Sequence, residues 1–134
     1  MTTPRLLPRL TDTNRAYWTG GADGRLHLQR CVACRRWVNP PVGRCPSCGG
    51  ELVAEPVSGR GTVFSFTVNH QEFRPEVPPP YVIAILALEE QDDLRVVANI
   101  VDADPDELRC GLGVQVAFEQ DGDYHVPVFR VAAS

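Results

Sequence analysis

The chain has 134 residues, 43% of them hydrophobic, which suffices for one domain of ordinary size with its own core. It has no stretch typical of a secretion leader and no apolar run of membrane-spanning length, so a soluble, cytoplasmic protein without a membrane partner is expected. The net charge of −4 is unevenly divided: residues 1–60 contain nine arginines and four acids, a balance of +5, whereas residues 61–134 contain four arginines and thirteen acids, a balance of −9. The acidic second part argues against a nucleic-acid groove there, because such a groove needs positive potential.

Residues 1–24 are predicted to form an N-terminal arm and a short helix. The helix is expected over residues 14–18, and a glycine pair shortly afterwards is expected to end it. Tyr17 and Trp18 are neighbours in sequence and cannot occupy the same face of a helix. We therefore expect one ring to pack on the ribbon described next and the other to contact a second subunit, with packing of both rings inside the chain as the alternative.

Residues 25–52 contain the strongest motif of the sequence, two C-x-x-C knuckles separated by ten residues. Each knuckle is a sharp turn that can direct two thiolates towards one ion, and four sulfur ligands suit tetrahedral zinc: Cys31, Cys34, Cys45 and Cys48. Because four cysteines complete the coordination sphere, a structural role is predicted for the zinc rather than a catalytic one. The segment is therefore predicted to be a rubredoxin-like zinc ribbon, which begins with a strand over residues 25–30.

Other interpretations of these cysteines stay open at the level of sequence, although zinc is favoured. Two disulfides would require an oxidising compartment. The same four thiolates could bind iron, as in an electron carrier. His27, four residues before the first cysteine, could act as a ligand in place of a thiolate. The fifth cysteine, Cys110, is expected to be a small buried side chain.

Residues 53–134 change to a pattern of repeated strands, so the whole chain is predicted to be mainly β. A short strand over residues 52–57 comes first. Five strands with a helical turn between the third and fourth then predict a barrel with the OB-fold layout, at residues 62–68, 81–88, 94–101, 114–119 and 124–131. The second of these strands is almost entirely apolar, which indicates burial on both faces. Alternation in the first predicts that Phe64 and Phe66 share the core-facing side.

These motifs resemble those of the zinc-ribbon/OB-fold acyl-CoA-associated proteins, a family long described as a domain of unknown function. The resemblance runs from about Tyr17 to Phe129 and depends on the Tyr-Trp helix, the C-x-x-C and C-P-x-C knuckles, and the strands that contain Gly-Arg-Gly-Thr-Val and Pro-Pro-Tyr-Val. It implies that the four knuckle cysteines bind zinc. It transfers no catalytic residue to this chain.

Members of this family are companion subunits of thiolase-like enzymes, either thiolases or thiolase-like aldolases, and sometimes of acyl-CoA hydratases. The resemblance therefore implies a non-catalytic accessory subunit that assembles with such an enzyme, with two copies of each chain, and stabilises it. It also implies that the chain can help to shape the acyl-CoA channel, while the catalytic residues lie on the partner.

Contacts with the partner or with CoA are expected away from the zinc ligands. The proline-rich loop over residues 71–80 is preset in an extended conformation, so its docking would cost little entropy. Aromatic and arginine side chains often dominate binding energy, and arginine grips phosphates such as those of CoA with paired donors. The candidates are Tyr17, Trp18, Arg60, His70, Phe73, Arg74 and Tyr81, with Arg30, Arg35, Arg36 and Arg44 as further candidates for CoA.

The alternative function is single-stranded nucleic-acid binding, because OB barrels and ribbons both occur in such proteins. It requires exposed aromatic and basic side chains on the barrel. The acidic balance of residues 61–134 and the predicted core position of Phe64 and Phe66 disfavour this function, so no nucleic-acid partner is expected.

Overall fold

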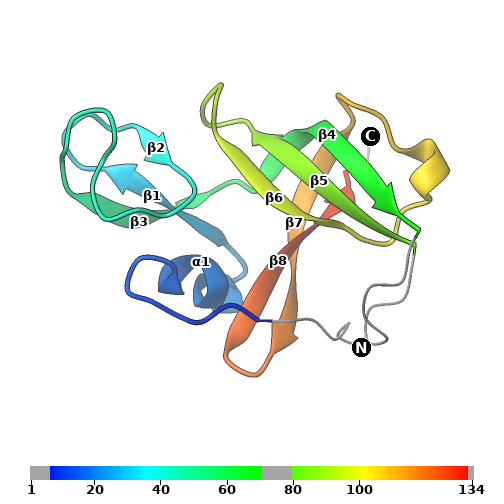
Figure 1. Cartoon of the computed structure of the whole chain (residues 1–134), viewed down its shortest axis with the longest axis horizontal. Coiled ribbons are helices and arrows are strands. Elements are labelled where there is room, and N and C mark those ends of the chain that lie inside the picture. Colours follow the sequence, from blue (N-terminus) through cyan, green and yellow to red (C-terminus); the bar gives the residue numbers. More distant parts are fainter. Residues whose placement is uncertain (1–6, 71–79, 133–134) are drawn as a thin grey trace.

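Two sheets account for most of the fold, a three-stranded ribbon sheet and a closed five-stranded barrel (Figure 1). The structure is a computed structural model that describes residues 7–70 and 80–132. Phe73 and Arg74, two of the expected contact residues, lie outside these ranges. No helix within them is long and apolar enough to cross a membrane. The mainly β fold predicted from the sequence is confirmed.

The ribbon sheet has the strand order β2-β1-β3 and consists of β1 (Leu26–Cys31), β2 (Trp37–Val38) and β3 (Leu52–Val57). β1 pairs with β3 in antiparallel fashion along its whole length, from Leu26 opposite Val57 to Cys31 opposite Leu52. The short strand expected before the barrel is therefore part of the ribbon sheet, and the chain enters the barrel after it.

The barrel closes with the strand order β4-β5-β6-β8-β7, which is the arrangement predicted for an OB-fold. A 3-10 turn, η2 (Pro105–Glu107), separates the third strand from the fourth, and the Asp104 carboxylate caps it by accepting a hydrogen bond from the Asp106 amide at 3.0 Å. The strands are β4 (Arg60–Asn69), β5 (Tyr81–Leu88), β6 (Arg95–Ile100), β7 (Gly113–Asp121) and β8 (Tyr124–Val131).

The N-terminal helix α1 (Arg15–Thr19) packs against β8 and continues directly as a 3-10 turn, η1 (Gly20–Asp23). The α-helix ends with Gly20 as its C-cap, as expected, and the glycine pair begins the 3-10 turn. Gly24 ends the segment in a left-handed conformation, with φ of 81°. Gly21 permits the close approach to the barrel, because a Cβ there would lie 2.5 Å from the ring of Phe118.

One hydrophobic core extends from the barrel into the ribbon. Its largest fully buried side chains include Phe129 and Leu86 from the barrel and Leu26 from the ribbon. Trp37 of β2 belongs to the same core and is only 7% exposed. The two parts are therefore packed together through shared apolar side chains.

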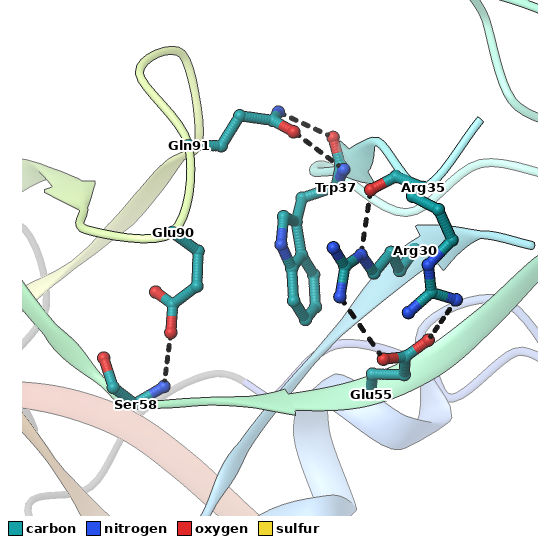
Figure 2. A network of polar contacts seen from close by, with 7 residues as sticks. All are labelled: Arg30, Arg35, Trp37, Glu55, Ser58, Glu90 and Gln91. Carbon is teal, nitrogen blue, oxygen red and sulfur yellow. Dashed lines mark hydrogen bonds and ion pairs between the residues drawn. The ribbon is translucent and has the colours of Figure 1, made fainter.

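Polar contacts from the β5–β6 turn also hold the ribbon against the barrel (Figure 2). The side chain of Gln91 accepts a hydrogen bond from the Trp37 amide at 2.9 Å and donates one to the Trp37 carbonyl at 3.0 Å. The adjacent Glu90 accepts a hydrogen bond from the amide of Ser58, the residue that connects the two sheets, at 2.7 Å. The side chain of Gln91 thus forms the pair of backbone hydrogen bonds that a further strand beside β2 would form.

A β-bulge in β4 changes the side of the barrel on which one aromatic residue lies. The register between β4 and β5 shifts between Val63 and Ser65, so one additional residue is inserted in β4. Val63 is buried, whereas Phe64 is 51% exposed. The prediction that Phe64 faces the core was therefore wrong, although Phe66 does pack against the core.

Candidate metal centre and predicted contact residues

The two cysteine knuckles have the same backbone geometry. In the first, the amide of Arg35 donates to the carbonyl of Cys31 at 3.0 Å. In the second, the amide of Gly49 donates to the carbonyl of Cys45 at 2.8 Å. The residue that closes each turn has a left-handed backbone, with φ of 65° at Arg35 and 74° at Gly49. Each turn thereby brings its two sulfur atoms to the same side.

The four sulfur atoms lie within 4.8 Å of one another, and no other group of metal-ligand side chains in the described ranges is placed in this way. The Sγ atoms of Cys31 and Cys48 are 3.5 Å apart, and those of Cys34 and Cys45 are 3.7 Å apart. A tetrahedral zinc ion with Zn–S bonds of about 2.3 Å needs sulfur atoms about 3.8 Å apart. Because a disulfide bond is about 2.05 Å long, these are free thiols placed for metal binding, and the disulfide interpretation is excluded.

The electrostatics of the cluster favour a cation. The hydrogen bond that the Cys34 amide donates to the Cys31 sulfur lowers the pKa of Cys31 to about 6. The Cys48 amide lowers the pKa of Cys45 in the same way. At Cys48 the amide of Gly50 lowers the pKa, but the neighbouring thiols outweigh it and raise the value to about 12. A divalent cation would remove this conflict, because it stabilises all four thiolates together.

Apolar side chains shield the buried half of the cluster. Cys31 and Cys45 are buried, and Val38 and Leu52 pack against them. Trp37 does not cover the cluster, because alternation along β2 directs it into the main core, away from Val38.

Gly50 is a position that the sequence did not single out and that the cluster requires to be small. A Cβ at this position would lie 2.8 Å from the Cys31 sulfur and 3.2 Å from the Cys48 sulfur. We expect Gly50→Ala to weaken metal binding by about 10-fold or more, the loss typical of a disturbed ligand environment. Competition with a chromophoric chelator measures the affinity. The matched control is Gly43→Ala, since a Cβ at Gly43 meets nothing within 4 Å; equal affinities of the two variants would contradict the tight fit.

His27 lies apart from the sulfur cluster. Its Nε2 atom is 3.5 Å from the carboxylate of Asp23. The ring packs beside Gly20, where a Cβ would lie 2.6 Å from Nδ1. His27 thus takes part in the contact between η1 and the ribbon and is not among the ligands.

Four of the five arginines considered for CoA are engaged in ion pairs within the chain. Arg30 and Arg35 both approach Glu55, at 3.7 and 3.3 Å (Figure 2), and Arg36 pairs with Asp93. Arg60 binds Glu89 through two hydrogen bonds of 3.1 and 3.0 Å, which lower the pKa of Glu89. Arg44 has no such partner among the described residues. The guanidinium groups of the other four arginines therefore already contact carboxylates of the chain.

The other predicted contact residues lie in separate parts of the fold. Tyr17 packs against the core, and its burial raises the pKa of the phenol to about 12. Trp18 is half-buried and packs edge-to-face on Tyr17, with the ring centres 4.9 Å apart. His70 is exposed just after β4, and Tyr81 is half-buried at the start of β5. Within residues 7–70 and 80–132, no hydrogen bond, ion pair or ring contact joins the Tyr17–Trp18 pair to the other two.

A four-cysteine ribbon joined to an OB barrel defines a two-part class of proteins, and family comparisons agree with this division. Residues 18–53 match the ChsH2 rubredoxin-like zinc ribbon domain, and residues 54–119 match the ChsH2 C-terminal OB-fold domain. The chain is 35% identical over 102 residues to a DUF35 domain-containing scaffold protein of Methanocaldococcus jannaschii, which covers 70% of each chain. The chain belongs to the DUF35 family, as its motifs predicted.

Two further relatives extend the comparison. A chain of the solved structure "Ltp2-ChsH2(DUF35) aldolase" is 35% identical, with a TM-score of 0.83, and the match covers 95% of this chain and 100% of that one. A probable enoyl-CoA hydratase alpha subunit of Thermomonospora curvata is 34% identical over 127 residues, which is 93% of this chain. This chain spans only 39% of the length of that hydratase subunit.

Proposed function

We propose that this chain is a non-catalytic accessory subunit that assembles with a thiolase-like enzyme, a thiolase or a thiolase-like aldolase, acting on acyl-CoA. The observation that carries the proposal is the match over the whole length of a chain from "Ltp2-ChsH2(DUF35) aldolase". The scaffold role in the name of the archaeal relative supports an assembly function as well. We further propose two copies of each chain in the complex and stabilisation of the enzyme by this subunit.

The residues support a non-catalytic role. Among the described residues, no serine, threonine or cysteine side chain donates a hydrogen bond to a histidine, the pairing by which a general base activates a nucleophile. The four knuckle cysteines would hold zinc, which contributes to folding and has no open position for substrate. The free thiols of the chain suit a reducing compartment, in agreement with the cytoplasm expected from the sequence.

An acyl-CoA hydratase is a second candidate partner. The hydratase alpha subunits of Thermomonospora curvata and Mycobacterium tuberculosis contain a region similar to this chain, which spans 39% and 32% of their lengths. Contact with CoA would occur at the interface with either enzyme, because four of the five candidate arginines are paired with carboxylates of the chain. Nucleic-acid binding remains disfavoured: the exposure of Phe64 removes one reason against it, but the charge of −9 over residues 61–134 stands.

An activity assay on separated and combined subunits tests the proposal. The chain is co-expressed with a candidate thiolase-like partner protein, and acyl-CoA turnover is measured for the complex and for each subunit alone. We expect turnover by the complex and none by this chain. When the partner is assayed without this chain, we expect its turnover to fall by about 10-fold or more, because this subunit no longer stabilises the enzyme dimer. Turnover by this chain alone would refute the non-catalytic role.

A further inference from the structure

The outer surface of the barrel carries exposed apolar side chains on three neighbouring strands. Phe64 of β4, Ile83 of β5 and Val97 of β6 are 51%, 38% and 64% exposed. The remaining large apolar residues that are exposed in the described ranges lie in the ribbon or at the end of β8: Val32, Val42, Val53 and Val131. The concentration on β4, β5 and β6 is therefore specific to one wall of the barrel.

Strand register joins these side chains into one surface. Val97 lies directly opposite Ile85, and Ile83 lies opposite Asn99, so Val97 and Ile83 are diagonal neighbours on the same face. Ser65, which follows Phe64, lies opposite Ile85. We call the side chains of Phe64, Ile83, Ile85, Val97 and Arg95 the outer patch.

The strand at the centre of the outer patch is apolar on both faces. Val82, Ala84, Leu86 and Leu88 point into the core, while Ile83 and Ile85 point outwards. A strand with one face in solvent normally alternates apolar and polar residues, whereas a strand covered on both faces does not. Figure 1 shows β5 between β4 and β6, and α1 packs elsewhere, against β8. The sequence of β5 is thus typical of a strand whose outer face is also buried, and no described residue of the chain covers that face.

Arg95 gives the outer patch a positive charge that no carboxylate of the described residues pairs with. Its guanidinium lies 4.0 Å from the centre of the Phe64 ring, and it reaches that ring across β5 at Ala87, the small residue opposite Arg95. Its Nε atom is buried without a hydrogen-bond partner, and no acidic residue of the described chain forms an ion pair with it. Five other arginines of the described chain, among them Arg36 and Arg60, are paired with carboxylates, whereas others such as Arg44 have no ion pair there either.

We propose that the outer patch is the surface through which this chain binds its thiolase-like partner, and that the partner covers the patch with apolar side chains and places a carboxylate against Arg95. The inference rests on the proposed function and assigns it a surface. An aromatic ring stacked with an arginine among aliphatic side chains is the composition typical of binding hot spots. A second copy of this chain would fit less well, because the outer patch contains no acidic residue to pair with Arg95. Single-stranded nucleic acid would meet one arginine on an acidic barrel.

Charge insertion into the outer patch tests this inference. Val97→Glu and Ile83→Glu are each purified, and the dissociation constant of their complex with the tagged candidate thiolase-like partner is measured by biolayer interferometry. We expect at least about 30-fold weaker binding, the loss typical of a hot-spot residue. The matched control, Val131→Glu, places the same charge at a valine that is 42% exposed on β8 and should bind like the wild type. Melting temperature and metal content identify a variant that is misfolded.

Reversal of the charge at Arg95 gives an independent readout. Arg95→Glu should weaken binding strongly, and Arg95→Lys, which keeps the charge, should retain more of it. If the wild-type chain does not bind the thiolase-like protein, the proposed function fails. If the wild type binds and the folded Val97→Glu, Ile83→Glu and Arg95→Glu variants bind equally well, the function stands and the outer patch is the wrong surface.

Two other molecules could bind the outer patch in place of the thiolase-like partner, and each would give a distinct experimental result. Light scattering on the isolated chain would reveal a dimer, and its loss in Val97→Glu would assign the outer patch to a second copy. Binding of a single-stranded oligothymidine that is lost in the same variant would assign it to nucleic acid. Either result would overturn the proposal.

Discussion

Replacing Cys45 with serine is expected to abolish metal binding and to unfold the ribbon. Cys45 is 3% exposed and is one of only four ligands, so its loss opens the coordination sphere at its buried side. The ribbon sheet has just three strands, and its own apolar cluster consists of two of the cysteines together with Val38 and Leu52. Metal binding contributes about 10–16 kcal/mol to the folding of zinc-finger peptides at neutral pH. We therefore expect the ribbon to depend on a bound metal for its folding.

Elemental analysis of the purified protein measures this effect. We expect about one zinc per wild-type chain and almost none in Cys45→Ser, with a lower and broader melting transition. Iron in place of zinc would colour the wild-type protein and identify an electron-carrier centre. The matched control is Cys110→Ser, because Cys110 is an exposed free thiol outside the cluster, contrary to the burial expected from the sequence. A Cys45→Ser variant that keeps its metal and its melting temperature would contradict the assigned ligand set.

Replacing Trp37 with alanine is expected to destabilise the whole chain by about 3–5 kcal/mol, the usual effect of removing a large aromatic side chain from a core. Trp37 is 7% exposed and belongs to the core shared by ribbon and barrel, and the Arg30 guanidinium lies 4.7 Å from its ring centre. Urea unfolding followed by circular dichroism measures the change. Metal content should persist, because the side chain points away from the sulfur cluster.

Trp18→Ala provides the comparison for Trp37→Ala. Trp18 is half-buried on a five-residue helix and packs on Tyr17, so its removal should cost clearly less. If Trp37→Ala lost no more stability than Trp18→Ala, ribbon and barrel would be independent units and not one packed body.

The sequence was informative where local rules determine the structure. The spacing of the cysteines is enough to predict the ligand group, because a C-x-x-C turn closes within a few residues. The alternation of apolar residues and the turn that begins at Pro105 are enough to predict five barrel strands with a helical turn between the third and fourth. Both features depend on neighbours in sequence, so they can be read without knowledge of the fold.

The features that sequence reasoning missed depend on distant neighbours. The bulge that exposes Phe64 is one inserted residue, and a simple alternation rule cannot detect it. Trp37 faces a core that the ribbon shares with the barrel, and Gln91, far along the chain, bonds its backbone there. The left-handed turn at Arg35 is a conformation that the sequence would assign to glycine. The outer face of β5 did leave a signal, its unbroken apolar run, but only the barrel shows which side is uncovered.

The mass of the co-purified pair tests the central proposal most directly. The chain and a candidate thiolase-like partner protein are co-expressed, purified through a tag on this chain alone, and measured by size-exclusion chromatography with light scattering. We predict one species that contains both proteins in equal numbers, with the mass of two copies of each, and about one zinc per copy of this chain. Elution of the chain at its own mass of 14.8 kDa, with the thiolase-like protein well folded but in separate fractions, would contradict the account.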